Sequence, residues 1–146
     1  EKLERWGDAI DAYEAANGIY KKAHFGRDSP VAVNNIGNAQ GGLGKWDEAL
    51  ANFRRAAELQ KSKFAAPRIS EALVLYQLGE REESMRLLKG LLLKYPNSPD
   101  LHAAMATSLW RSGERTLAND EWELATEEGL GDPRYADAAW VREVRR

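Results

Sequence analysis

The sequence predicts an all-α fold in which short helices pair and stack, and three observations lead to this prediction. Between Asn34 and Leu59, apolar side chains recur at spacings of three, four and seven residues, so they share one face of a 3.6-residue helix. Gly44, Gly79 and Gly113 lie 35 and 34 residues apart, which indicates a repeated helix–turn–helix unit. No stretch shows the apolar–polar alternation of a strand. Each helix pair buries its apolar face on its neighbours, so the expected architecture is an α-solenoid.

Length and composition exclude several classes of function. The 146 residues suffice for one domain with a core. A net charge of −2, with 30% charged residues of both signs, gives no electrostatic case for nucleic acid or an anionic membrane surface. There are no cysteines, so thiol catalysis and zinc–thiolate sites are absent. No apolar run approaches the roughly 20 residues that cross a bilayer.

The compartment is left open by the sequence. No signal or transit peptide is visible. Because the chain begins at Glu1 rather than Met, in what the pattern indicates is the middle of a repeat, we expect a processed chain whose removed part carried any targeting signal.

Start and stop signals divide the chain into eight expected helices. Three dipeptides place an N-cap residue before a proline at the first helical position, namely Ser29-Pro30, Ser98-Pro99 and Asp132-Pro133. Pro67 falls in a first turn, where it is tolerated, and Pro96 ends a helix. The expected helices lie near residues 3–24, 30–43, 46–62, 66–78, 81–94, 99–112, 115–128 and 133–145.

The segment from Val33 to Ala56 carries a resemblance to a known family. An apolar residue, an apolar–small pair, Gly, an aromatic, Ala, an aromatic and Ala occur in this order as Val33, Ile36-Gly37, Gly44, Trp46, Ala49, Phe53 and Ala56. This order resembles the tetratricopeptide repeat. One place departs, because the aromatic expected three residues after Gly37 is Gln40. The resemblance implies a right-handed α-solenoid of helix hairpins that binds other proteins.

Aligning the chain on this pattern gives one domain of three and a half repeats. Its parts are a half repeat at 1–29, repeats at 30–64, 65–98 and 99–131, and a capping helix at 132–146. Trp6, Trp46 and Trp122 occupy repeat positions and are expected in the core. The half repeat keeps only its second helix, lengthened as in kinesin-light-chain-type adaptors. Its apolar surface therefore needs a cover, which leaves self-association open.

The closing segment provides a second resemblance. The motif that runs from Gly129 to Tyr135 and continues with Trp140 and Val144 to Arg146 is similar to the end of tetratricopeptide proteins of cyanobacteria and the chloroplast thylakoid lumen. Tyr135 and Ala139 are expected to face inward and cap the array. This resemblance implies a chloroplast thylakoid location and an assembly or peripheral role in a photosystem. The alternative is a general cytoplasmic adaptor.

No catalytic, cofactor-binding or metal-binding residue is indicated. A metal site needs three or four convergent ligands, and His24 and His102 belong to different repeats with no second His nearby. Solvated or capping roles are expected for both. Acidic runs such as Glu80 to Glu83 have neighbours of mixed sign and are expected to be solvated helix faces. The sequence therefore predicts a protein that is not an enzyme.

The repeat register places seven residues on the inner groove that tetratricopeptide arrays use for peptides: Asn34, Asn38, Ile69, Leu73, Tyr76, Thr107 and Trp110. The family's carboxylate clamp is not expected, because Ala66 and Ser70 stand where its cations would be. A groove that is polar at one end and apolar at the other favours a partner segment with apolar anchors. For Trp110, coverage by the last helix or a neighbouring repeat is an equal alternative.

Three classes of function remain. The leading hypothesis is a scaffold that binds another protein, without nucleic acid and without direct membrane insertion. The second is an enzyme or small-ligand binder, which the groove residues do not favour because they include no convergent His or carboxylate. The third is a self-associating structural piece joined through the half repeat.

Overall fold

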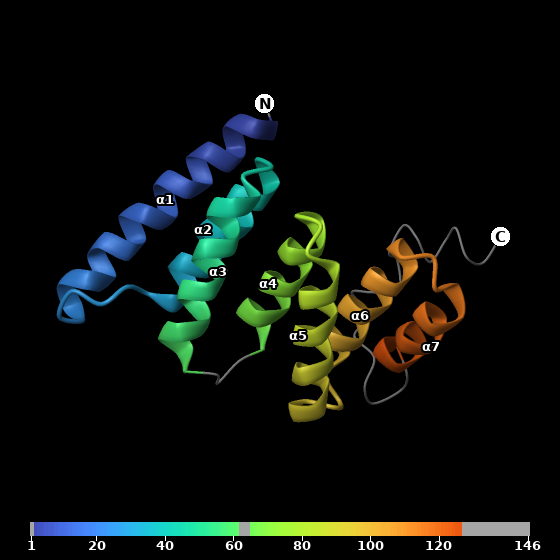
Figure 1. The fold of residues 1–146 in the computed structure, drawn as a ribbon. Helices are drawn as coiled ribbons and strands as arrows, with labels where there is room; N and C mark the ends of the chain where they lie inside the picture. The colour runs from blue at the N-terminus through green and yellow to red at the C-terminus, as the bar shows by residue number, and fades with distance from the viewer. Residues whose placement is uncertain (1, 62–64, 127–146) are drawn as a thin grey trace. The chain divides into compact units, whose positions relative to one another are not determined.

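The computed structural model describes residues 2–61 and 65–126, and within these ranges it contains seven α-helices and no strand (Figure 1). They are α1 Lys2–Ala23, α2 Pro30–Gly42, α3 Trp46–Gln60, α4 Ala66–Gln77, α5 Arg81–Lys94, α6 Pro99–Arg111 and α7 Arg115–Thr126. Each begins and ends within two residues of its expected bounds. The prediction of an all-α fold is confirmed, whereas the expected helix at 133–145 lies outside the described residues.

The three turn glycines occupy equivalent turns. Gly44, Gly79 and Gly113 have φ of +75°, +91° and +86°, a backbone conformation that costs other residues energy. In each turn the next amide reaches back five residues: Lys45 N donates to Gln40 O, Glu80 N to Leu75 O and Glu114 N to Leu109 O, at 2.9–3.0 Å. These bonds satisfy carbonyls that a helix end leaves open. The 34–35-residue spacing therefore marks one structural repeat.

Two of the predicted N-caps are present. Ser29 Oγ accepts from Ala32 N, at 3.3 Å, and Ser98 Oγ accepts from Leu101 N, at 3.4 Å. In both cases a proline follows and begins the helix, where its missing N–H costs nothing. The third predicted cap, at Asp132, lies outside the described residues.

The described residues fall into two compact units, one ending at Ser84 and the next beginning at Met85. In the first unit α1 packs on α2, α2 on α3 and α3 on α4, and in the second α6 packs on α7. From α1 to α4, each helix therefore packs on the next one along the chain. The bounds expected for the individual repeats stay a prediction.

Small residues are buried where helices touch, and aromatic rings fill the space between them. Ala49 and Ala56 of α3 and Ala118 of α7 are fully inaccessible to solvent. Phe53 and Trp122, at the aromatic positions of the repeat, are buried beside them. Of the three tryptophans expected in the core, Trp122 is buried, whereas Trp6 and Trp46 are half-buried.

Gln40, which departs from the repeat pattern, joins α2 to α3 by hydrogen bonds. Asn52 Nδ2 donates to Gln40 Oε1 at 2.7 Å, and Gln40 Nε2 donates to Glu48 Oε2 at 3.3 Å. An amide pair thus stands where the family places an aromatic ring.

The connection from α1 to α2 is fixed by polar contacts to Asp28. Asn17 Nδ2 donates to Asp28 Oδ1 at 2.8 Å, Lys21 Nζ lies 2.9 Å from the same oxygen, and Arg55 Nη2 lies 3.4 Å from Oδ2. Ser29 N donates to Asn17 Oδ1 at 2.8 Å. The hydrogen bonds that Asp28 accepts lower the pKa of its carboxyl below the ordinary value. The bond from Lys21 has the largest effect, and the bond from Asn17 the next largest.

Gly37→Ala is expected to destabilise the protein by about 1–3 kcal/mol, although alanine is the better helix former. A Cβ at Gly37 would lie 2.9 Å from Phe53 Cε1, inside the packed interface of α2 and α3. The matched control is Gly18→Ala in α1, where a Cβ meets nothing within 4 Å, and a gain of up to about 1 kcal/mol is expected. Urea unfolding measures both, and equal effects of the two substitutions would contradict the close approach.

Asp28→Asn is expected to lower the free energy of unfolding at neutral pH by about 1 kcal/mol, since the ion pairs of Asp28 are partly exposed. A carboxyl whose pKa is lowered by folding stabilises the protein above its unfolded pKa, and this contribution is lost as the pH falls below the ordinary value of 3.8. The stability difference between parent and variant should therefore shrink across that acid range in denaturation curves. Lys21→Met should reduce the pH dependence of stability in the same acid range. If the stability difference between the parent and Asp28→Asn stays constant with pH, the lowered pKa of Asp28 is refuted.

Candidate functional site

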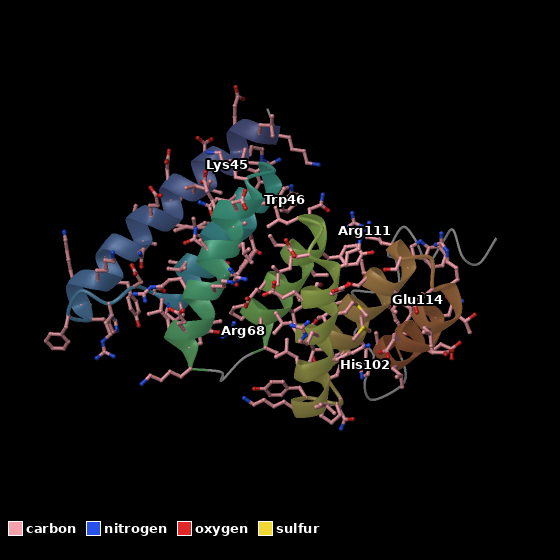
Figure 2. All side chains as sticks on the ribbon, viewed as in Figure 1. Lys45, Trp46, Arg68, His102, Arg111 and Glu114 are labelled. Carbon is pink, nitrogen blue, oxygen red and sulfur yellow. The ribbon has the colours of Figure 1, made fainter. Side chains whose placement is uncertain are left out.

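A hollow of about 210 Å³ opens in the first unit between α2, α3 and α4. Its lining combines glycines, two aromatic rings, aliphatic side chains and two small polar groups: Gly37, Gly41, Trp46, Phe53, Leu73, Val74, Asn38 and Ser70. Trp46 lies at the start of α3, where Figure 2 labels it. The hollow is therefore an apolar recess with an amide and a hydroxyl among its lining groups, and we refer to it as the α2–α4 hollow.

The shape of this hollow follows from the glycines of α2. Phe53 Cε1 lies 2.9 Å from the place where Gly37 would carry a Cβ, and Trp46 Cζ3 lies 3.2 Å from the corresponding place at Gly41. The two aromatic rings therefore lie directly against the α2 backbone. A side chain at either position would displace a ring and fill the recess.

Two of the seven predicted groove residues, Asn38 and Leu73, line the α2–α4 hollow together. Asn38 is exposed, and Leu73 retains 37% of its surface in water. A third, Asn34, is half-buried, and no described group donates a hydrogen bond to its buried Oδ1 atom. Because this oxygen is buried and Asn34 does not line the hollow, Asn34 is not placed to contact a partner there.

Ile69 and Tyr76, although predicted to face the groove, are buried. Tyr76 is only 5% exposed, and the Arg81 guanidinium lies 5.3 Å from the centre of its ring. Their positions on α4 differ from that of Leu73, which keeps its exposure. Ile69 and Tyr76 therefore belong to the interior that supports the surface of α4.

Thr107 and Trp110 lie on α6 in the second unit, and both are half-buried. Thr107 Oγ1 donates to Ala103 O at 2.9 Å, so its hydroxyl is engaged within its own helix. The Arg115 guanidinium lies 3.6 Å from the centre of the Trp110 ring, a cation–π contact that covers one face of the indole. The alternative that the last helix covers Trp110 concerns residues outside the described ranges.

Cations near α4 are held by a buried carboxylate. Arg54 Nε donates to Glu71 Oε1 at 2.9 Å, and Arg68 Nη1 donates to Glu71 Oε2 at 2.7 Å, while the Glu71 side chain is 6% exposed. This pairing joins α3 to α4. The positions that hold cations in the family's carboxylate clamp are occupied here by Ala66 and Ser70.

The two histidines have different surroundings. His24 is exposed, as expected, and stacks on Tyr20 with ring centres 3.7 Å apart. His102 is buried, contrary to the expected solvated or capping role: Nδ1 lies 2.7 Å from Glu121 Oε2, and Nε2 lies 2.8 Å from Pro96 O (Figure 2). His102 therefore links α6 to α7 and to the preceding turn.

Within the described ranges, no group of three or more His, Cys, Asp or Glu side chains is arranged to hold a metal ion. No helix of those ranges is long and apolar enough to cross a membrane. The arrangement of the first unit is suited to non-covalent recognition, because its hollow is lined by apolar surface and neutral polar groups.

The sequence did not single out Trp46, Phe53 and Ser70 as parts of a recess. Trp46 and Phe53 match the repeat pattern and were assigned to the core, which is where one side of each ring does pack. The available signal was the pair Gly37 and Gly41, one turn apart on α2, because glycines at this spacing let the rings of the next helix lie against the α2 backbone.

Comparison with known proteins connects this geometry to a family. A model of the tetratricopeptide repeat matches residues 42–107, which span α3, α4, α5 and part of α6. None of the curated proteins matches the chain. The paired helices and turn glycines agree with an all-α solenoid of this type. The match to residues 42–107 supports the interpretation of the chain as a tetratricopeptide repeat protein.

Proposed function

We propose that the protein is a non-catalytic scaffold that binds a segment of another protein through the α2–α4 hollow. Tetratricopeptide repeats generally mediate protein–protein interaction, which supports the general role. The observation that carries the specific proposal is the hollow itself, with aromatic walls, a glycine floor and an exposed amide beside them. Its volume of about 210 Å³ suits one large side chain rather than a whole ligand.

The chemistry of the hollow defines the partner segment. An aliphatic or aromatic anchor would contact Trp46, Phe53 and Leu73 and exchange water for apolar surface. Beside it, the exposed side chain of Asn38 can donate to and accept from a peptide backbone. A short extended or helical segment with one apolar anchor fits these groups.

The second unit contributes a further proposed contact at Trp110. The guanidinium of Arg115 lies over one face of the indole, and Trp110 as a whole is half-buried. Rigid aromatic side chains lose little entropy on binding and are frequent hot spots. Thr107 lies one turn earlier on α6 and extends the same helix face.

A narrower proposal places this scaffold in photosynthesis, as an assembly factor or peripheral subunit of a photosystem at the thylakoid. It rests on the resemblance of the closing segment, residues 129–146, which lies outside the described residues. A cytoplasmic adaptor of the kinesin-light-chain type and self-association through α1 are its alternatives. No residue of α1 is fully buried, and Leu3 and Ile19 are exposed. This exposed apolar surface is the observation that favours self-association through α1.

Leu73→Asp is expected to reduce capture of partner proteins at least tenfold, because it places a charge among the apolar walls of the hollow. Leu73 is 37% exposed, so the fold should tolerate the change. The measurement is affinity capture from native extract with quantitative mass spectrometry. Val31→Asp is the matched control, since Val31 is an exposed aliphatic residue of α2 that does not line the hollow.

The capture experiment distinguishes the proposals. Proteins bound by the parent and by Val31→Asp but lost with Leu73→Asp would support the hollow as the binding site. Equal capture by all three would contradict it. Photosystem proteins among those lost would support the narrower proposal, whereas cytoplasmic partners would overturn it and leave the general scaffold.

A further inference from the structure

A larger hollow, of about 440 Å³, lies in the second unit and shares no residue with the α2–α4 hollow. It is bounded by three helices: the part of α5 from Met85 onward, α6, and α7 with the residue before it. Six of its lining residues are aliphatic: Met85, Leu92, Leu93, Met105, Leu109 and Leu117. We refer to this surface as the α5–α7 groove.

The groove has a buried floor and exposed walls. Met105 and Leu109 of α6 are buried, whereas Leu93 of α5 is 88% exposed and Leu117 of α7 is 51% exposed. Two large aliphatic side chains are thus exposed to water, one on the α5 wall and one on the α7 wall of an apolar recess. Such exposed apolar surface is typical of an interaction site. The methionines add side chains that adapt readily to a partner.

The length of the groove walls matches about two turns of a helix. Its α5 wall carries Met85, Lys89 and Leu92 at positions i, i+4 and i+7, and its α7 wall carries Glu114, Leu117 and Glu121 at i, i+3 and i+7. Each wall is therefore one stripe about two helical turns, or roughly 10 Å, long. Two such walls with a third helix as the floor form three sides of a four-helix arrangement, and a fourth helix would complete it.

The charges along the groove select the kind of helix. Glu114, labelled in Figure 2, and Glu121 flank Leu117 on the α7 wall, and Lys89 lies on the α5 wall. Glu121 is also bonded to His102, which fixes its carboxylate at the edge of the groove. Carboxylates outnumber cations among the lining residues, so the complementary partner presents lysine or arginine beside its apolar face.

We propose that the α5–α7 groove binds an amphipathic helix of another protein, with aliphatic anchors over two turns and basic residues along the flank that faces α7. The anchors cover Leu93 and Leu117 and rest on Met105 and Leu109. The basic flank pairs with Glu114 and Glu121. This site is independent of the function proposed for the α2–α4 hollow, because the two surfaces have no residue in common.

The test uses the full chain and two defined peptides of about 18 residues, long enough to fold on a surface. One carries leucines on one helical face and lysines on both flanks, and the other has glutamates in place of the lysines. Fluorescence anisotropy with labelled peptide measures Kd. The lysine peptide is expected to bind more tightly than the glutamate peptide.

Variants locate the binding. Leu93→Ala/Leu117→Ala should weaken the lysine peptide at least about tenfold, since it removes both exposed anchors. Ile19→Ala/Val31→Ala removes two equally exposed aliphatic residues from the first unit and should leave Kd within about twofold. Glu114→Lys should weaken the lysine peptide and strengthen the glutamate peptide, each about threefold, as expected for exposed charge pairs.

Three results would overturn the proposal. The first is an absence of saturable binding, and the second is the same Kd for the parent and Leu93→Ala/Leu117→Ala. The third comes from sedimentation: if the parent dimerises and Leu93→Ala/Leu117→Ala does not, a second copy of this chain occupies the groove. Circular dichroism of each variant confirms that the fold is retained in these comparisons.

Discussion

The close approach of aromatic rings to the backbone of α2 is the constraint on which the first unit depends. Gly37, Gly41 and Gly42 each lie against a ring, namely those of Phe53, Trp46 and Trp6. Glycine inside a helix costs about 1 kcal/mol relative to alanine, so three in one short helix need a compensating gain. That gain is the burial of aromatic surface from α1 on one side and α3 on the other. Gly37 and Gly41 also line the recess that we propose as a binding site.

Buried and half-buried polar side chains in both units bond across helix contacts. Glu71 holds Arg54 and Arg68 between α3 and α4, Gln40 pairs with Asn52 between α2 and α3, and His102 joins Glu121 of α7. A buried polar group is costly unless it is satisfied, so each of these bonds restricts its helix pair to one arrangement. The charged residues of the core therefore serve helix packing, and the hollows are left with mostly apolar linings.

The features predictable from sequence are those set by local chemistry. The helix bounds follow from apolar periodicity, and the turns follow from Gly44, Gly79 and Gly113, since only glycine adopts their backbone conformation without strain. Ser29 and Ser98 cap helices as expected because the cap is a contact within three residues.

The features that sequence reasoning missed depend on neighbours distant in the chain or on the depth of packing. Leu73 and Tyr76 are three residues apart on α4, yet Leu73 is partly exposed and Tyr76 is buried. The repeat alignment assigns both residues to the same helix face and does not predict this difference in burial. The guanidinium over Trp110 comes from Arg115, beyond a turn. The burial of His102 requires a carboxylate from the next helix. The sequence therefore places the seven candidate residues on helix faces, and of these seven the structure brings only Asn38 and Leu73 to the hollow.

The central claim is that the α2–α4 hollow receives a segment of another protein. Site-specific photocrosslinking tests it most directly, with a photoreactive amino acid at position 73 inside the hollow and, separately, at position 31 on the exposed side of α2. The account predicts a discrete crosslinked protein in native extract from position 73 and none of the same protein from position 31. The same crosslinks from both positions, or none from position 73, would contradict it.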